Sequence, residues 1–368
     1  KLITNGIPSD YPVRVVREDP GAAGVLYAGT EYGMFISFDD GAKWQPFQQN
    51  LPITPVTDIK IYRNDLVLST MGRSFWVIDD ITPLHELAKA KQQSAYLFKP
   101  VDTYAFRYRG NARTEVPYFP APGVIIDYYL KSKPTGDIKL EILSAGKVIR
   151  SFTSAVPPRD TTRAEGRNMA TNFTARNTRA DLAKNSGANR FRWDMTHNGP
   201  WDADPSRNRR GGHRVSPGNY EVRLTVDHQA MTQPFSILMD PRVKGTATID
   251  DLKATEKLVF EVNAVMDTVK RVANKIKKQR KEIAALIKAG KASEAQTSQD
   301  KSLARLEDLL TTKEGAYEKP QLIDQLNYLR QQLDQADQAP GKDLYLRYEE
   351  LRAQAAGVLA DYAANVQK

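Results

Sequence analysis

The segment "SFDDGAKW" (37–44) brings two acidic residues, a glycine and a tryptophan together at fixed spacing. Paired carboxylates hydrolyse glycosidic bonds, but they must face each other across a cleft, about 5–10 Å apart. Asp39 and Asp40 are neighbours in the sequence, and neighbouring side chains on a strand point to opposite faces. This pair therefore does not by itself indicate catalysis.

A structural role explains every position of the same segment. An aspartate such as Asp39 can accept hydrogen bonds from backbone N–H groups of its own turn. Gly41 permits a positive φ, and Trp44 can pack beneath the hairpin. We therefore interpret Ser37, Asp39, Gly41 and Trp44 as a structural motif and assign no catalytic residue in this chain.

The segment belongs to a repeat, because residues 25–41 align with residues 66–81 at an offset of forty. Phe35 then matches Phe75, and the pair Asp79–Asp80 is a degenerate copy without the following Gly-x-x-Trp. A β repeat of about forty residues is typical of a propeller blade, and closed propellers need about four to eight blades. Since fewer than two are present, we expect the remaining blades on another polypeptide or on a removed N-terminal part.

Other chemistry has weak support. The chain has no cysteine, which excludes disulfides and thiolate catalysis. Asp194, Asp202 and Asp204 are weak candidate oxygen ligands for calcium, and a turn-rich loop without a ligand is the favoured interpretation. No other metal or cofactor is expected. A sialidase-type site would need an arginine cluster and a tyrosine nucleophile, for which too few blades are present. The four histidines are scattered, without metal-ligand spacing: His85, His197, His213 and His228.

The elements around these residues predict a multidomain chain, mainly β and then α. Residues 1–97 are expected to be terminal propeller blades closed by a short helix at 82–93, with Thr82 as its N-cap. Six alternating apolar segments within 98–244 predict an antiparallel, immunoglobulin-like sandwich with a polar insertion at about 155–188. Apolar residues at three- and four-residue steps from 245 to 368 predict an antiparallel bundle of three or four helices.

The charge balance is basic, with a net charge of +9 that is partly concentrated in 155–214. That segment has no recognition-helix pattern, so we expect a solvated loop and no nucleic-acid partner. The basic run at 275–282 is expected to be a solvated helix face. No apolar run approaches the ~18 residues that a membrane span needs.

Ser37-x-Asp39-x-Gly41-x-x-Trp44 resembles the Asp-box of bacterial-neuraminidase (BNR) repeats, which also occurs in sortilin-like propellers and in xyloglucan-cleaving propeller hydrolases. With "GVIIDYYLKS", "RFRWDM" and "SPGNYEVRLTVD", the chain resembles the C-terminal part of large exported bacterial BNR propeller proteins. Such proteins are often labelled glycosyl hydrolases.

The resemblance implies an exported protein, periplasmic, secreted or at the cell surface, whose export signal lies outside this chain. It implies a non-catalytic binding or assembly segment that recognises other cell-envelope proteins or a glycan. The alternative is the accessory C-terminal part of a propeller glycoside hydrolase with its catalytic acids in the missing blades. A third possibility is peptide or protein capture inside the propeller channel, as in sortilin-like proteins.

Overall fold

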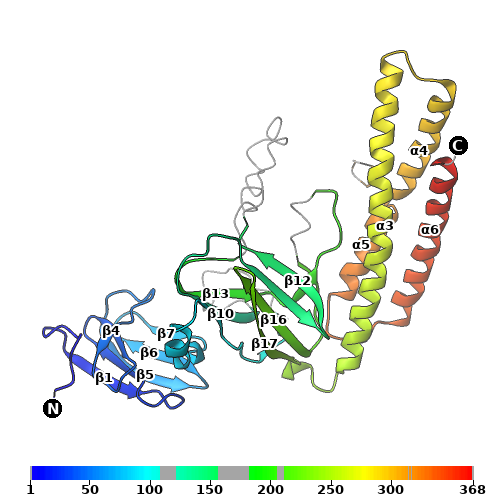
Figure 1. The fold of residues 1–368 in the computed structure, drawn as a ribbon. Helices are drawn as coiled ribbons and strands as arrows, with labels where there is room; N and C mark the ends of the chain where they lie inside the picture. The colour runs from blue at the N-terminus through cyan, green and yellow to red at the C-terminus, as the bar shows by residue number, and fades with distance from the viewer. Residues whose placement is uncertain are drawn as a thin grey trace. The chain divides into compact units, whose positions relative to one another are not determined.

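The structure is a computed structural model that describes residues 2–107, 122–155, 182–204, 211–313, 315 and 317–366. As predicted, the chain is β-rich first and α-helical at its C-terminal end, and no closed barrel is formed by the described residues (Figure 1). Most of the predicted polar insertion lies outside the described residues, and the three predicted domain ranges stay a prediction. The chain divides into two compact units: unit 1 comprises Lys1–Val101, Asp127–Lys133 and Asn185–Arg190, and unit 2 comprises Asp102–Ile126, Pro134–Lys184 and Phe191–Lys368.

Unit 1 begins with two antiparallel meanders that repeat each other. Both start with a bulged strand whose first residue lies opposite a threonine, Thr30 in one sheet and Thr70 in the other. Each threonine hydroxyl donates a hydrogen bond to a backbone oxygen across its hairpin. The first sheet has the order β1 (Val13–Glu18), β2 (Leu26–Thr30), β3 (Gly33–Ser37), β4 (Trp44–Pro46), and the second has the order β5 (Val56–Tyr62), β6 (Asp65–Thr70), β7 (Phe75–Ile78).

The register of the second meander corrects the predicted alignment. Leu26 pairs with Ser37 in the first sheet, whereas its equivalent Leu66 pairs with Ile78. The second hairpin loop is therefore one residue longer, and β3 corresponds to β7 at an offset of 41. Phe35 is equivalent to Trp76, not to Phe75 as the sequence alignment predicted. A one-residue slip exchanges the faces of a strand, which explains why Phe35 is buried while Phe75 is 76% exposed.

The two sheets stack face to face around a shared core. One face of the first sheet, including Tyr27 and Ile36, packs on the face of the second sheet that carries Ile59, Leu66 and Leu68. An ion pair of 2.7 Å between Arg17 Nη2 and Asp58 Oδ1 joins the same two sheets. In the second sheet, the residues equivalent to the packed face of the first sheet point away from the shared core. We call this outward side the open face, formed by Lys60, Val67, Ser69, Phe75 and Val77.

The opposite face of the first sheet is covered by the segment that precedes β1. Ile7 and Tyr11 from this segment pack against Leu26, Phe35 and Trp44. The indole Nε1 of Trp44 donates a 2.7 Å hydrogen bond to the carbonyl oxygen of Ile3. Both faces of the first sheet are therefore buried within unit 1.

The helical segment after β7 differs from the prediction. It forms two single turns, α1 (Thr82–His85) and α2 (Leu87–Ala90), instead of one helix. The N-cap position is Ile81, and Thr82 is the first helical residue. Strand β8 (Ala95–Leu97) follows and pairs with β10 (Val124–Leu130).

Unit 2 contains most of the predicted β-rich region. Its five-stranded sheet has the order β12-β11-β16-β17-β9, in which β9 (Thr103–Tyr104) runs parallel to β17. The parallel pair corrects the prediction of a wholly antiparallel sandwich. Trp193, Tyr220 and Phe235 pack with ring centroids about 6 Å apart, which gives this unit an aromatic core. The other strands of this unit are β11 (Lys139–Ser144), β12 (Lys147–Thr153), β14 (Thr196–Asn198), β15 (Gly211–Arg214), β16 (Gly218–Val226) and β17 (Gln229–Leu238). Strand β13 (Gly187–Trp193) begins in unit 1, ends in unit 2 and pairs with β10.

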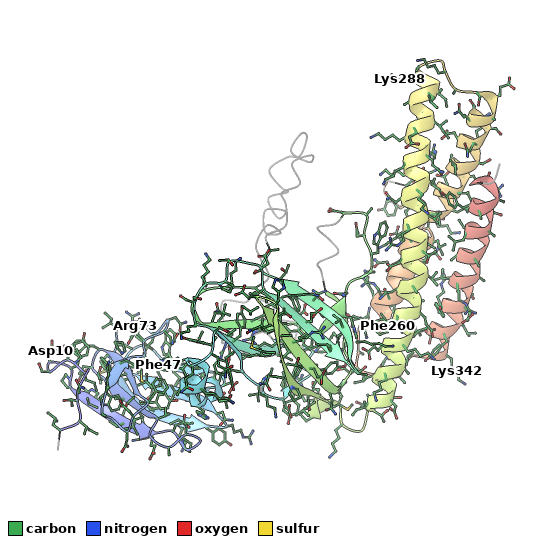
Figure 2. The ribbon with its side chains drawn as sticks, viewed as in Figure 1. Asp10, Phe47, Arg73, Phe260, Lys288 and Lys342 are labelled. Atoms are coloured by element: carbon green, nitrogen blue, oxygen red, sulfur yellow. The ribbon has the colours of Figure 1, made fainter. Side chains whose placement is uncertain are left out.

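The predicted helical region is confirmed as four helices that share one apolar core. A capping box between Thr248 and Asp251 begins the first helix, because each side chain accepts from the other residue's backbone N–H. Helix α4 ends at Leu310 and α5 begins at Leu322, and Gly315 and Pro320 lie in the segment between them. Figure 2 shows Lys288 and Lys342 at opposite ends of the bundle. The helices are α3 (Ile249–Lys288), α4 (Glu294–Leu310), α5 (Leu322–Leu333) and α6 (Lys342–Val366).

Burial supports the interpretation of the basic run at 275–282 as a solvated face. Lys275, Lys277, Lys278 and Lys281 are exposed, and Ile276 between them enters the core. In the described part of the chain, no helix combines the length and apolar character needed to cross a membrane.

Candidate functional site

The motif residues of the first meander form a closed hydrogen-bonded turn. Ser37 Oγ accepts from the N–H of Gly41 at 2.9 Å and donates to Asp39 Oδ1 at 2.8 Å. The same oxygen of Asp39 accepts from the N–H of Lys43 at 2.8 Å. Hydrogen bonds from Lys43 and Ser37 hold the pKa of Asp39 below its ordinary value. The carboxylate of Asp39 is thus engaged by its own turn, and Trp44 is buried beneath it.

Asp79 and Asp80 occupy the corresponding turn of the second meander and have different partners. Asp80 has the same φ of 56° as Asp40, so the left-handed residue of the turn is retained. Its Oδ1 accepts from both the N–H and the hydroxyl of Thr82, which satisfies the start of α1. The carbonyl oxygens of Asp79 and Asp80 accept hydrogen bonds from the guanidinium of Arg190 at 3.1 and 3.3 Å.

Arg190 also binds a buried carboxylate. Its Nε and Nη2 each lie 2.8 Å from an oxygen of Asp127, which is a bidentate pair. Burial raises the pKa of Asp127 above its ordinary value, and the guanidinium offsets this only in part. Sequence reasoning missed this pair because its members are 63 residues apart and lie on different strands. The signal that the sequence offered for this pair was the position of Arg190 within a predicted strand.

A cavity of about 430 Å³ lies beside the end of β7 in unit 1. Phe47, Ile81, Leu84 and Phe98 give it apolar walls, and Asp127 and Arg190 form a polar wall. This volume is more than ten times the ~30 Å³ share of one water molecule. The cavity is large enough for one large side chain.

The open face carries apolar side chains in contact with solvent in unit 1. Phe75 is 76% exposed and Val77 is 54% exposed. Val67 is half-buried and lies directly opposite Val77. Contiguous apolar surface of this kind typically marks an interaction site.

A hydroxyl, a carboxylate and an imidazole meet in unit 2 without forming a catalytic triad. Ser216 Oγ donates to Glu256 Oε2 at 2.7 Å, and Glu256 Oε1 binds His197 Nε2. The carboxylate therefore lies between the hydroxyl and the imidazole, whereas a hydrolytic triad needs the imidazole in the central position. Burial alone would raise the pKa of Glu256, but hydrogen bonds from His197 and Ser216 lower it below its ordinary value. This cluster attaches α3 to the β-rich region.

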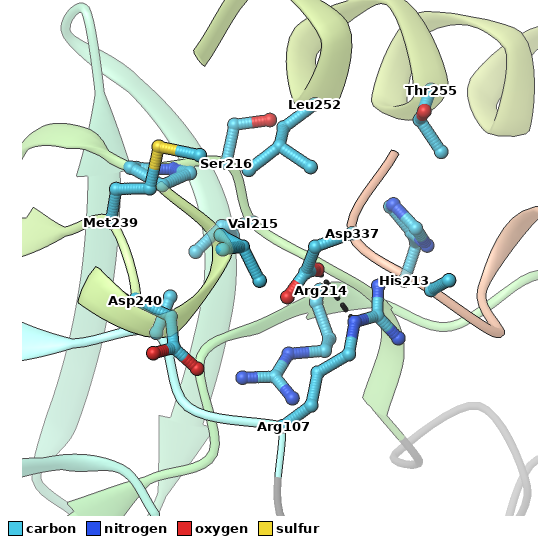
Figure 3. Close-up of a pocket in the computed structure, with 14 residues that line it drawn as sticks. Arg107, His213, Arg214, Val215, Ser216, Met239, Asp240, Leu252, Thr255 and Asp337 are labelled. Carbon is cyan, nitrogen blue, oxygen red and sulfur yellow. Dashed lines mark hydrogen bonds and ion pairs between the residues drawn. The ribbon is translucent and has the colours of Figure 1, made fainter. Parts of the chain in front are cut away.

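A second polar cluster joins the end of α5 to the β-rich region (Figure 3). Arg107 Nε lies 2.5 Å from Asp337 Oδ1, and His213 Nδ1 lies 3.2 Å from Asp334 Oδ1. Burial and the neighbouring Arg107 lower the pKa of Arg214. The cavity among these residues measures about 30 Å³, the share of one water molecule, so the cluster is a packed contact.

The candidate calcium ligands are engaged locally. Asp194 Oδ1 accepts from the hydroxyl of Thr196 at 2.7 Å, and Asp202 Oδ1 accepts from the N–H of Asp204 at 2.9 Å. Across the described ranges, no group of three or more His, Cys, Asp or Glu side chains is placed to hold a metal ion. The arginine-rich residues 156–181 and 205–210 lie outside the described residues.

The comparisons with known proteins identify no family. No family model matches this chain, and no curated protein matches it. Among solved structures, it matches a chain from a study of PorZ, described as an essential bacterial surface component of the type-IX secretion system of Porphyromonas gingivalis. The match has 13% identity and a TM-score of 0.19, and it covers 62% of this chain and 23% of that chain. A TM-score this low establishes no common fold, so the BNR resemblance stays a prediction.

Proposed function

We propose that this chain is a non-catalytic binding and assembly segment of an exported propeller protein of the cell surface or periplasm. Its two meanders are then the last blades, and further blades pack on the open face. The β-rich region of unit 2 is then an immunoglobulin-like sandwich, and its loops, with those of the blades, recognise a protein or a glycan. The observation that carries this proposal is the exposed apolar surface of Phe75 and Val77 on a repeat whose first copy has packing partners on both faces.

The direction of stacking supports the proposal. Each meander has two faces, one equivalent to the open face and one opposite to it. The first meander packs its equivalent of the open face against the opposite face of the second meander. Contacts between unlike faces can be continued by a further copy, whereas contacts between like faces close after two copies. A third meander would cover Val67, Phe75 and Val77 in the way that the second covers Tyr27, Met34 and Ile36.

Photo-crosslinking from the open face tests the proposal. A benzoylphenylalanine residue replaces Phe75 in the protein made in its native cells, and mass spectrometry identifies the attached peptide. The expected adduct is a β-meander segment of an exported polypeptide or of sequence preceding residue 1. The same residue at the exposed position Lys275 on α3 is the matched control. Absence of an adduct at Phe75, or the same adducts at both positions, would contradict the proposal.

The glycoside hydrolase alternative makes a different claim about the longer protein, that it cleaves polysaccharide with acids outside this chain. A glycan-hydrolysis screen of the longer protein tests it. Cleavage that is lost when acids of other blades are changed would replace the non-catalytic proposal. Cleavage lost on changing Asp39, in a protein that stays folded, would place the chemistry in this chain.

A further inference from the structure

We propose that β7 is a docking edge for an extended peptide strand from another polypeptide segment. The incoming strand pairs antiparallel with β7 and places a large apolar side chain opposite Ile78, in the cavity beside it. This inference goes beyond the packing proposed for the open face. It concerns the backbone edge of the sheet and the cavity, and it holds whether or not further blades cover Phe75 and Val77.

The first meander provides the template for the missing strand. It has four strands, whereas the second has three, so β3 is paired on both sides and β7 on one. On β3, Ile36 lies opposite Gln45, and Met34 accepts a 2.8 Å hydrogen bond from the N–H of Phe47. At the offset of 41, the residues equivalent to Met34 and Ile36 are Phe75 and Val77.

The edge of β7 is unpaired within the described chain. Its strand hydrogen bonds go to β6 alone, and the outward backbone groups of Phe75 and Val77 make none in the described residues. Natural edge strands are usually protected by lysine, proline or a bulge. The four residues of β7, "FWVI", include none of these protecting features. Their backbone is therefore available for strand addition.

The cavity lies where the missing strand would place a side chain. In the first meander, Trp44 lies opposite Ser37 and is only 3% exposed. Ile78 is the equivalent of Ser37, and it lines the cavity of about 430 Å³ together with Phe47 and Leu84. A side chain opposite Ile78 would thus enter the cavity, just as Trp44 fills the corresponding place in the first sheet.

The polar wall of the cavity selects against charge on that side chain. The guanidinium of Arg190 is already bound to Asp127 and to the carbonyl oxygens of Asp79 and Asp80. A carboxylate entering the cavity would have to compete with Asp127, and an ammonium group would have to compete with Arg190. Desolvating an unpaired charge is costly, so the occupant is a neutral aromatic or aliphatic side chain.

A synthetic peptide with the sequence of residues 41–50, "GAKWQPFQQN", is the probe, because this segment already pairs with β3. The complete chain is titrated with labelled peptide by fluorescence anisotropy, and hydrogen exchange is followed in β7. We expect saturable binding and slower exchange at Phe75 and Val77. A peptide carrying Trp44→Gly should bind about tenfold more weakly, because it leaves the cavity empty.

Two peptides, each N-methylated at one position, serve as the test and its matched control. Methylation at Gln45 removes a hydrogen bond to the strand edge, and it should abolish binding. Methylation at Trp44 should be tolerated, because in the chain its N–H points away from β3 and donates to Asn5 O. No protection of β7 at millimolar peptide, equal binding of the Gln45-methylated peptide, or equal binding of the Trp44→Gly peptide would each overturn the inference. None of these outcomes affects the crosslinking result expected at the open face.

Discussion

Arg190 and Asp127 form a bidentate ion pair in which both nitrogen–oxygen distances are 2.8 Å. Asp127 is 9% exposed, so its carboxylate depends on this partner for compensation. The same guanidinium binds two carbonyl oxygens in the turn after β7. One arginine therefore joins strand β10 to the second meander within unit 1.

Removing the guanidinium should destabilise unit 1. We expect Arg190→Met to lower the free energy of unfolding by about 1–3 kcal/mol, because a buried carboxylate and two carbonyls lose their donors. Urea unfolding followed by the fluorescence of Trp44 and Trp76 measures this. Arg14→Met, which breaks an exposed pair with Glu31, is the matched control and should cost less than about 1 kcal/mol. Equal effects of the two substitutions would contradict the structural role of Arg190.

The hydrogen-bonded turn of the first meander should contribute to stability. Ser37 is fully buried, and Ser37→Ala leaves the N–H of Gly41 without its acceptor. We expect a loss of about 1–2 kcal/mol in urea unfolding. Asp39→Ala should lower stability in the same direction, and Asp79→Ala should leave it unchanged because only the backbone oxygen of Asp79 is used.

The pH dependence of the Asp39 contribution follows from its depressed pKa. The contribution should be complete above pH 3.8, the ordinary pKa, and be lost as the pH falls through the folded value. If Asp39→Ala were as stable as the native chain, the turn would not depend on this carboxylate.

Neighbouring residues of β7 should respond oppositely to substitution. Trp76 is half-buried and packs against the core between the two sheets, and Trp76→Ser should cost about 2 kcal/mol. Phe75→Ser changes the open face and should alter stability by less than about 0.5 kcal/mol in the chain alone. Chemical unfolding of both variants tests the corrected register. A larger loss for Phe75→Ser would support the offset of forty instead.

Acid should weaken the attachment of α3 in unit 2. Because the folded pKa of Glu256 lies below 4.5, its contribution is complete above that pH and is lost as the pH falls through the folded value. We expect the free energy of unfolding, measured by Trp193 and Trp201 fluorescence, to decline below about pH 4.5. In Glu256→Gln this decline should be shallower. Some slope should remain, since the pKa of Asp334 is lowered as well.

Periodicity predicted the strands and helices well, because each depends on local alternation and capping. Strands β10, β11, β12 and β16, for example, lie in the region 98–244 where alternating apolar segments predicted strands. Contacts between distant residues were not accessible in the same way. His197 and Glu256, for example, are 59 residues apart, and neither lies in a recognisable motif.

The repeat shows which features of the fold the sequence could predict and which it could not. Its existence was evident from matching residues, such as Thr30 with Thr70. Its register was not, since one extra residue in a hairpin loop changes which side chains share a face. The aspartates masked this slip, because Asp40 and Asp80 remain forty residues apart with the same backbone conformation. The docking edge became visible only after the faces were assigned.

The length of α3 has a practical consequence for handling the protein. Its 40 residues extend for about 60 Å, and Arg271, which stacks on Trp201 at 4.4 Å, is followed by roughly 25 Å of helix. Lys288 and Lys291, on either side of the turn to α4, are both exposed. A dye, a biotin or a surface tether attached at this turn would sit far from the polar clusters that secure the helices. Immobilised in that way, the protein would keep these polar clusters away from the support.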